Sequence, residues 1–285
     1  MRPIPTIALL GLGTAGLGSW YKFHHLKPKT LRQYLEWQGL RLISDSESNY
    51  WKAVIEENKE LAQKLGIDTS KIDGIKEWCK SHMDSEKYED IKDSGLLLCV
   101  DNPKTVKARI IQLDGGTDRL IHGDDADKKY KVAYVFRKHI SGLHSLIGYQ
   151  PKVGDKGEEQ VVFEEATDLF KKWCTSSLDK PLDETLVLNI RELCTPKGFS
   201  KVRDYLTGKA LLTDSGKDTQ LQAKYDKIHN FASYKQDITD NNKDGLKNWC
   251  TTKLDEEFSK DLSIFEEILP KVISRCVEGT ESTEK

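Results

Sequence analysis

Six cysteines are the residues of this sequence whose type and spacing suggest chemistry most directly. They fall into three successive pairs that are separated by 20, 20 and 26 residues: Cys79 and Cys99, Cys174 and Cys194, Cys250 and Cys276. A disulfide within one pair would close a loop of about 20 residues, which the chain-entropy model values at roughly 3 kcal/mol. An even number of regularly paired cysteines favours structural disulfides and an oxidising compartment.

Other chemistries of these cysteines stay open at this point. Buried free thiols pack as small apolar groups, and the positions of the cysteines on apolar stripes suit that alternative. A zinc site needs Cys or His ligands in close pairs such as C-x-x-C, which the sequence lacks, and His82 near Cys79 has no counterpart elsewhere. A nucleophilic cysteine is disfavoured because no histidine recurs beside the three pairs.

Three glycines near the amino terminus suggest a different chemistry. Gly11, Gly13 and Gly16 satisfy G-x-G-x-x-G after the strand-like TIALL. This fingerprint holds the pyrophosphate of NAD only at a strand–turn–helix, with an acidic residue about 20 positions further on. Glu36 has that spacing but lies in the helix-like stretch YLEW. An NAD-dependent oxidoreductase is therefore kept as an alternative function.

A half-match to a calcium loop occurs at residues 240–245, which read D-x-N-x-D-G. The twelfth position of such a loop requires a bidentate glutamate, and Thr251 stands there. We interpret the stretch as a polar loop that caps a helix. The acidic run at 122–127 is interpreted as a solvated loop, so we expect no catalytic residue, no metal site and no cofactor.

The elements that carry the first cysteine of each pair resemble one another. The pattern D-x-φ-K-x-W-C-x-x-x-φ-D, in which φ is apolar, occurs at residues 73–84, 168–179 and 244–255. Its apolar positions recur at the i, i+3, i+4 spacing of an amphipathic helix. We therefore expect three related helices and place the tryptophan of each in a core: Trp78, Trp173 and Trp249.

The aspartate that opens each pattern is expected near the amino terminus of its helix. A carboxylate there favours the helix dipole and satisfies free amides. These residues are Asp73, Asp168 and Asp244.

The repeated pattern predicts an all-α fold of three related helical units, with three to four helices each and no sheet. We place them at residues 30–104, 105–200 and 201–285, the last with a frayed carboxyl terminus. The Asn102-Pro103 and Thr195-Pro196 steps fit breaks, because a residue before proline avoids the helical region. Partner contacts are expected in the divergent loops at 114–129 and 149–159, since loops carry function on a rigid scaffold.

The first 29 residues are expected to form a signal anchor with a basic flank. Residues 4–21 carry no charge, and Trp20 and Tyr21 end the run, where aromatic rings prefer the membrane interface. Lys22, Lys27 and Lys29 follow, which by the positive-inside rule would keep the body cytoplasmic. Disulfides argue for the opposite side, and we favour an extracytoplasmic body with the orientation open.

The charge balance excludes one class of partner. Lysine and arginine number 44, aspartate and glutamate 46, and the formal net charge is −2. A nucleic-acid binder usually presents a strongly basic body. We therefore expect no nucleic acid as a partner.

The apolar amino terminus and the D-x-φ-K-x-W-C copies together resemble the paralogous proteins of haemotropic mycoplasmas, bacteria that attach to red cells and lack a cell wall. The resemblance covers nearly the whole chain. It implies surface exposure and antigenic variation, and it brings no catalytic residue to carry over.

These observations predict a membrane-anchored, surface-exposed helical repeat protein that acts in interaction or as a variable antigen, without catalysis. Its expected partners are the membrane, through residues 4–21, and a host or surface protein. Two alternatives to this function are kept: the NAD-dependent oxidoreductase, and an intracellular helical scaffold with reduced thiols.

Overall fold

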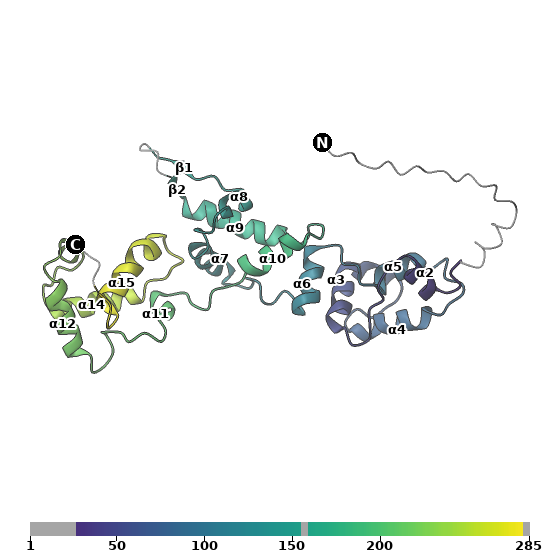
Figure 1. Ribbon diagram of the computed structural model, residues 1–285, viewed down its shortest axis with the longest axis horizontal. Coiled ribbons are helices and arrows are strands. Elements are labelled where there is room, and N and C mark those ends of the chain that lie inside the picture. Colours follow the sequence, from purple (N-terminus) through teal and green to yellow (C-terminus); the bar gives the residue numbers. More distant parts are fainter. Residues whose placement is uncertain (1–26, 155–158, 282–285) are drawn as a thin grey trace, which may run out of the picture. The chain divides into compact units, whose positions relative to one another are not determined.

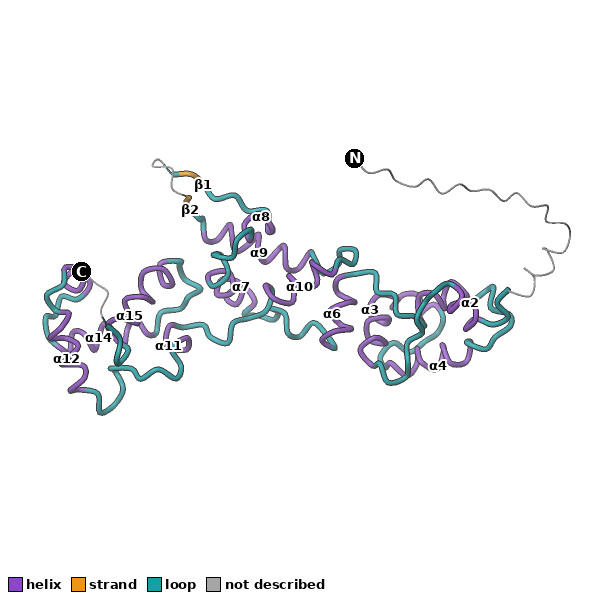
Figure 2. Tube along the Cα trace, in the orientation of Figure 1, coloured by secondary structure: helices purple, strands orange, loops and turns teal. Residues whose placement is uncertain are grey.

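The computed structural model describes residues 27–154 and 159–281, and these residues are mostly helical (Figures 1 and 2). The all-α class expected from the sequence is confirmed. The chain divides into two compact units, Met1–Pro103 and Lys104–Lys285.

The first unit contains four described helices: α2 (Leu31–Trp37), α3 (Ser48–Lys64), α4 (Ile72–His82) and α5 (Lys92–Leu98). The Thr30 hydroxyl caps α2 by accepting from the amide of Gln33 at 3.3 Å. Helix α3 has a kink at Asn58, whose side-chain amide donates to the carbonyls of Val54 and Leu97. The bond to Leu97 therefore connects α3 to α5.

Buried apolar residues from Leu31 to Val100 form the first core. Leu31 is fully buried there, and a Cβ built on Gly95 would lie 3.0 Å from its side chain. Glycine at position 95 lets α5 approach α2 closely.

The second unit begins with the helices α6 (Val106–Asp114), α7 (Ala126–Val135), α8 (Leu143–Ile147), α9 (Phe163–Ser176) and α10 (Glu184–Leu193). Two short antiparallel strands, β1 (Lys152–Val153) and β2 (Glu159–Gln160), lie between α8 and α9. They stand where the sequence analysis expected a loop at 149–159. Buried residues from Val106 to Cys194 form the second core.

The rest of the second unit contains α11 (Val202–Tyr205), α12 (Asp218–Ile228), α13 (Ala232–Asp237), α14 (Lys243–Leu254), the π-helix η1 (Ile264–Ile268) and α15 (Leu269–Cys276). Buried residues from Val202 to Val277 form the third core, and Val132 of α7 belongs to it as well.

Helix α7 joins the second and third cores. One of its faces carries Tyr134 and packs on Phe170 of α9. Its other side carries Val132, and Phe136 at its end sits among the rings of the third core, 4.8 Å from Phe258 between centroids. Edge-to-face aromatic packing stabilises such contacts beyond their buried area. The two cores therefore belong to one compact unit, whereas the first core stands in the other.

The structure differs from the sequence expectations at Asp168 and in the stretch 114–129. Asp168 does not lie near the start of its helix, because α9 already begins at Phe163 and places Asp168 in the second turn. Asp73 and Asp244 do lie in the first turns of α4 and α14. The loop expected at 114–129 ends early, since α7 begins at Ala126.

The anchor at residues 4–21 and the glycines at 11, 13 and 16 lie outside the described residues. Among the helices that the structure does describe, none has both the length and the apolar character needed to cross a membrane.

Candidate functional site

Three disulfides join the cysteines in the pairs that the spacing suggested: Cys79–Cys99, Cys174–Cys194 and Cys250–Cys276. In each, the Cα atoms are 5.7 Å apart, and no cysteine is free. The first cysteine lies in α4, α9 or α14, and the second ends or follows α5, α10 or α15. Each bond therefore fastens the helix that carries the Trp-Cys pattern to the last helix of its core.

The carbonyl of the second cysteine accepts the same backbone bond in all three places. Ile43 donates its amide to Cys99 at 3.2 Å, Ile121 to Cys194 at 2.8 Å and Leu212 to Cys276 at 2.8 Å. The donor in each case follows the first helix of its core. The disulfide and this bond hold three segments at one point.

A second backbone bond recurs at the start of each core. The first residue of α2, α6 and α11 donates its amide to a carbonyl six residues beyond the first cysteine of the pair. The bonds run from Leu31 to Ser85, from Val106 to Lys180 and from Val202 to Glu256, at 3.2, 3.1 and 3.1 Å. A helix amide that would otherwise lack a partner is satisfied in this way.

One bond is present in two of the three places. Its donor is the residue two positions after the second cysteine of the pair. Asp101 donates its amide to the carbonyl of Arg41, and Glu278 donates its amide to the carbonyl of Ala210. The corresponding residue of the second core is Pro196, which has no amide hydrogen. The sequence itself explains the missing bond.

The three tryptophans expected in cores differ in burial. Trp173 is buried in the second core with 8% of its surface exposed. Trp78 and Trp249 are half-buried at the edges of the first and third cores. Trp249 stacks under the fully buried guanidinium of Arg275, at 4.7 Å from the ring centroid.

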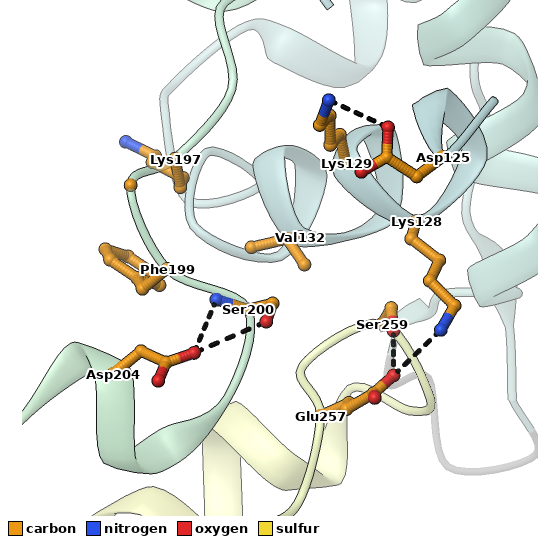
Figure 3. Close-up of a pocket in the computed structure, with 11 residues that line it drawn as sticks. Asp125, Lys128, Lys129, Val132, Lys197, Phe199, Ser200, Asp204, Glu257 and Ser259 are labelled. Atoms are coloured by element: carbon orange, nitrogen blue, oxygen red, sulfur yellow. Dashed lines mark hydrogen bonds and ion pairs between the residues drawn. The ribbon is translucent and has the colours of Figure 1, made fainter. Parts of the chain in front are cut away.

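A cavity of about 300 Å³ lies between the start of α7 and the chain from 197 to 204, within the second unit (Figure 3). Val132 and Phe199 line its apolar part. The charged residues around it are Asp125, Lys128, Lys129, Lys197, Asp204 and Glu257.

Most of these charges have fixed partners. Lys129 pairs with Asp125 at 2.8 Å, and Lys128 reaches Glu257 at 3.4 Å (Figure 3). Asp204 accepts from the amides of Lys201 and Ser200, and these bonds hold its pKa below the usual range. A carboxylate held in this way stays ionised and is a poor proton acceptor near neutral pH.

Lys197 differs from its neighbours, because no described residue forms an ion pair or a hydrogen bond with its ammonium group. Its partial burial and the nearby charge of Arg137 lower its pKa. Arg137 is itself buried and donates to the carbonyl of Glu192 and the hydroxyl of Thr195. The nearby carboxylate of Glu192 raises this pKa, and an anionic group beside the ammonium would act in the same sense by stabilising its charged form.

The sequence analysis pointed to the residues on only one side of this cavity. Asp125, Lys128 and Lys129 fall in the stretch 114–129 that was expected to contact a partner. Lys197 and Phe199 fall in a break between expected units, and no motif marks them. Asn242 of the half calcium loop acts as a helix cap, since its side-chain oxygen accepts from the amide of Gly245 at 2.8 Å.

Comparison with known proteins gives no relative: no family model, no curated protein and no solved structure matches this chain.

Proposed function

We propose that this protein is a membrane-anchored helical repeat protein whose body lies outside the cytoplasm and acts by binding a partner. In this proposal residues 4–21 are the anchor, and residues 30–104, 105–200 and 201–285 are three copies of one ancestral unit. Repeated helical units present surfaces and loops, which suits interaction rather than catalysis.

The repeat assignment is supported by geometry as well as by sequence. The same two backbone bonds surround each disulfide, although the intervening helices differ in length and number. The copies thus share the contacts nearest the disulfide, and they differ in the insertions that carry α8, β1 and β2.

The observation that carries the location is that all six cysteines are paired. Disulfides persist in oxidising compartments and are rare where thioredoxin and glutathione keep thiols reduced. The lysines after residue 21 favour the opposite orientation, and we give the three disulfides more weight because each joins buried cysteines of a separate core. The resemblance to surface proteins of haemotropic mycoplasmas agrees with this choice.

The surface that we propose for partner contact is the cavity around Lys197. An unpaired cation beside the apolar side chains of Val132 and Phe199 suits an acidic side chain that brings an apolar neighbour. Such a contact would place one carboxylate against Lys197 and cover the ring of Phe199.

Labelling of intact cells tests the proposal. Cells that make the full chain are treated with an amine-reactive reagent that does not cross membranes, and modified lysines are identified by mass spectrometry. We expect lysines of all three cores, including Lys52, Lys172 and Lys235, to be modified without lysis, while a cytoplasmic control protein is not. Modification only after lysis would show that the body faces the cytoplasm.

A further inference from the structure

A second cavity, of about 320 Å³, opens onto a disulfide in the first unit. Both Cys79 and Cys99 line it, together with the apolar side chains of Leu42, Trp51 and Met83. Cys79 is the most exposed of the six cysteines, although only 4% of its surface is accessible. In the third core, by contrast, Cys250 and Cys276 are both at 0%. A small molecule can therefore approach this disulfide through the cavity.

The rim of this cavity is positively charged. Arg32, Lys76 and Lys80 line it, Asp45 is the one acidic residue among the lining residues, and Arg32 is paired with Asp84 at 3.5 Å. Lys76 donates to the main-chain carbonyl of Asp45 at 2.8 Å, so its positive charge is not neutralised by a carboxylate in that bond. The exposed Lys80 has no ion pair with any described residue.

The corresponding positions beside the other two disulfides carry less free positive charge. The residue after the first cysteine is Lys80 here, whereas it is Thr175 in α9 and Thr251 in α14. The lysine three residues before that cysteine is paired with a carboxylate in both other cases, Lys171 with Asp127 at 2.5 Å and Lys247 with Asp218 at 3.9 Å. Lys76 and Lys80, which have no carboxylate partner among the described residues, therefore flank this first cysteine together with Glu77, whereas the exposed Lys172 lies beside Cys174.

We propose that Cys79–Cys99 is an exchange site for small anionic thiols. Disulfides exchange by attack of a thiolate on one sulfur, and attack depends on access and on the local charge. The incoming thiolate forms a bond to Sγ of Cys79, the Cys79–Cys99 bond breaks, and Cys99 leaves as a thiolate. A second thiol molecule, attacking the mixed disulfide, releases the oxidised small molecule and leaves both cysteines reduced. The thiol is the reductant, so electrons balance at each step.

Exchange in the folded full chain with two probe thiols tests this site. The anionic probe is 2-mercaptoethanesulfonate and the cationic probe is cysteamine, at equal thiolate concentrations in a non-denaturing buffer. Reactions are stopped with acid and N-ethylmaleimide, and opened bonds are identified by peptide mass. We expect Cys79–Cys99 to open first with the anionic probe, and the anionic-to-cationic rate ratio to be several-fold higher at this bond than at the other two.

Charge variants make the test specific. Lys80→Gln removes one charge from the lining of this cavity, and the loss of one close Coulomb attraction in water lowers the rate of the anionic probe about threefold. Lys172→Gln removes an exposed lysine beside Cys174 and leaves the rate at Cys79–Cys99 unchanged. Added salt lowers the ratio in the unaltered chain, because it screens exposed charges. The proposal is overturned if another disulfide opens first. It is also overturned if the anionic-to-cationic rate ratio at Cys79–Cys99 changes neither in Lys80→Gln nor with added salt.

Discussion

The amide of Leu212 donates to the carbonyl of Cys276 at 2.8 Å, directly beside the disulfide between Cys276 and Cys250. Equivalent bonds reach Cys99 and Cys194 in the other two cores. Each cysteine pair therefore fixes a third segment in addition to the two helices that it joins. In each core the disulfide adds loop closure to this backbone contact.

Removal of the second disulfide tests this contribution. We expect Cys174→Ala combined with Cys194→Ala to lower the free energy of unfolding of the second unit by about 3 kcal/mol, the value of a closed loop of this length. Chemical denaturation followed by circular dichroism measures the change. The backbone bond from Ile121 to Cys194 does not need the sulfur, so the variant should keep its helical content at low denaturant. An unchanged unfolding midpoint would show that the disulfide adds nothing to stability.

Gly245 is expected to be intolerant of any side chain. A Cβ there would lie 2.1 Å from the carbonyl oxygen of Asp240, which is fixed by the tight loop before α14. Backbone cannot move aside cheaply, so we expect Gly245→Ala to destabilise the second unit by about 2 kcal/mol or more.

Gly198→Ala is the matched control for Gly245→Ala, because nothing lies within 4 Å of a Cβ at position 198. Its thermal unfolding midpoint should stay within a degree or two of the unaltered chain. Equal shifts for the two variants would contradict the close approach of the Asp240 carbonyl.

Asp114 gives the second unit a specific acid sensitivity. Arg191 donates two hydrogen bonds to its carboxylate, at 2.8 and 2.7 Å, and lowers its pKa below the ordinary value of 3.8. A lowered folded-state pKa adds stability that is complete above the ordinary value and is lost as the pH falls below it. Asp114→Asn should therefore cost about 2 kcal/mol at pH 7 and much less near pH 2.

Urea unfolding of Asp114→Asn at the two pH values measures this difference. The exposed Asp118 lies in the loop that follows α6, so Asp118→Asn serves as the control and should change stability little at either pH. A cost of Asp114→Asn that is the same at both pH values would show that its charge is not what stabilises the unit.

Deletion of residues 1–22 separates the proposed anchor from the alternative of an NAD site at Gly11, Gly13 and Gly16. In a dinucleotide-binding fold the deletion removes the first strand and its phosphate turn, so the body should lose structure. We expect instead that the shortened chain keeps its helical circular dichroism and all three disulfides, because the described cores begin at Leu31. Loss of helical structure on deletion would favour the nucleotide-binding alternative.

The sequence predicted the cysteine pairs and the helices that carry Trp-Cys because those features repeat and have a clear helical period. It did not predict that α7 joins two cores, since no motif marks Val132 and Phe136 as residues that pack on a second core. The position of Asp168 was wrong because α9 extends upstream over residues 163–167, which are absent from the shared pattern. The sequence did not indicate Lys197, because this residue differs from its neighbours only in that no described residue pairs with its ammonium group. That property depends on the folded structure and not on spacing along the chain.

The state of the cysteines in the protein as its own cells make it tests the central claim most directly. Cells are lysed into acid, and the chain is alkylated under denaturing conditions with and without prior reduction. Intact mass then counts the free thiols. The proposal of a disulfide-bonded body outside the cytoplasm predicts no alkylation before reduction, six alkylated cysteines after it, and peptides linked as Cys79–Cys99, Cys174–Cys194 and Cys250–Cys276. Six free thiols before reduction would contradict it and would place the body in a reducing compartment.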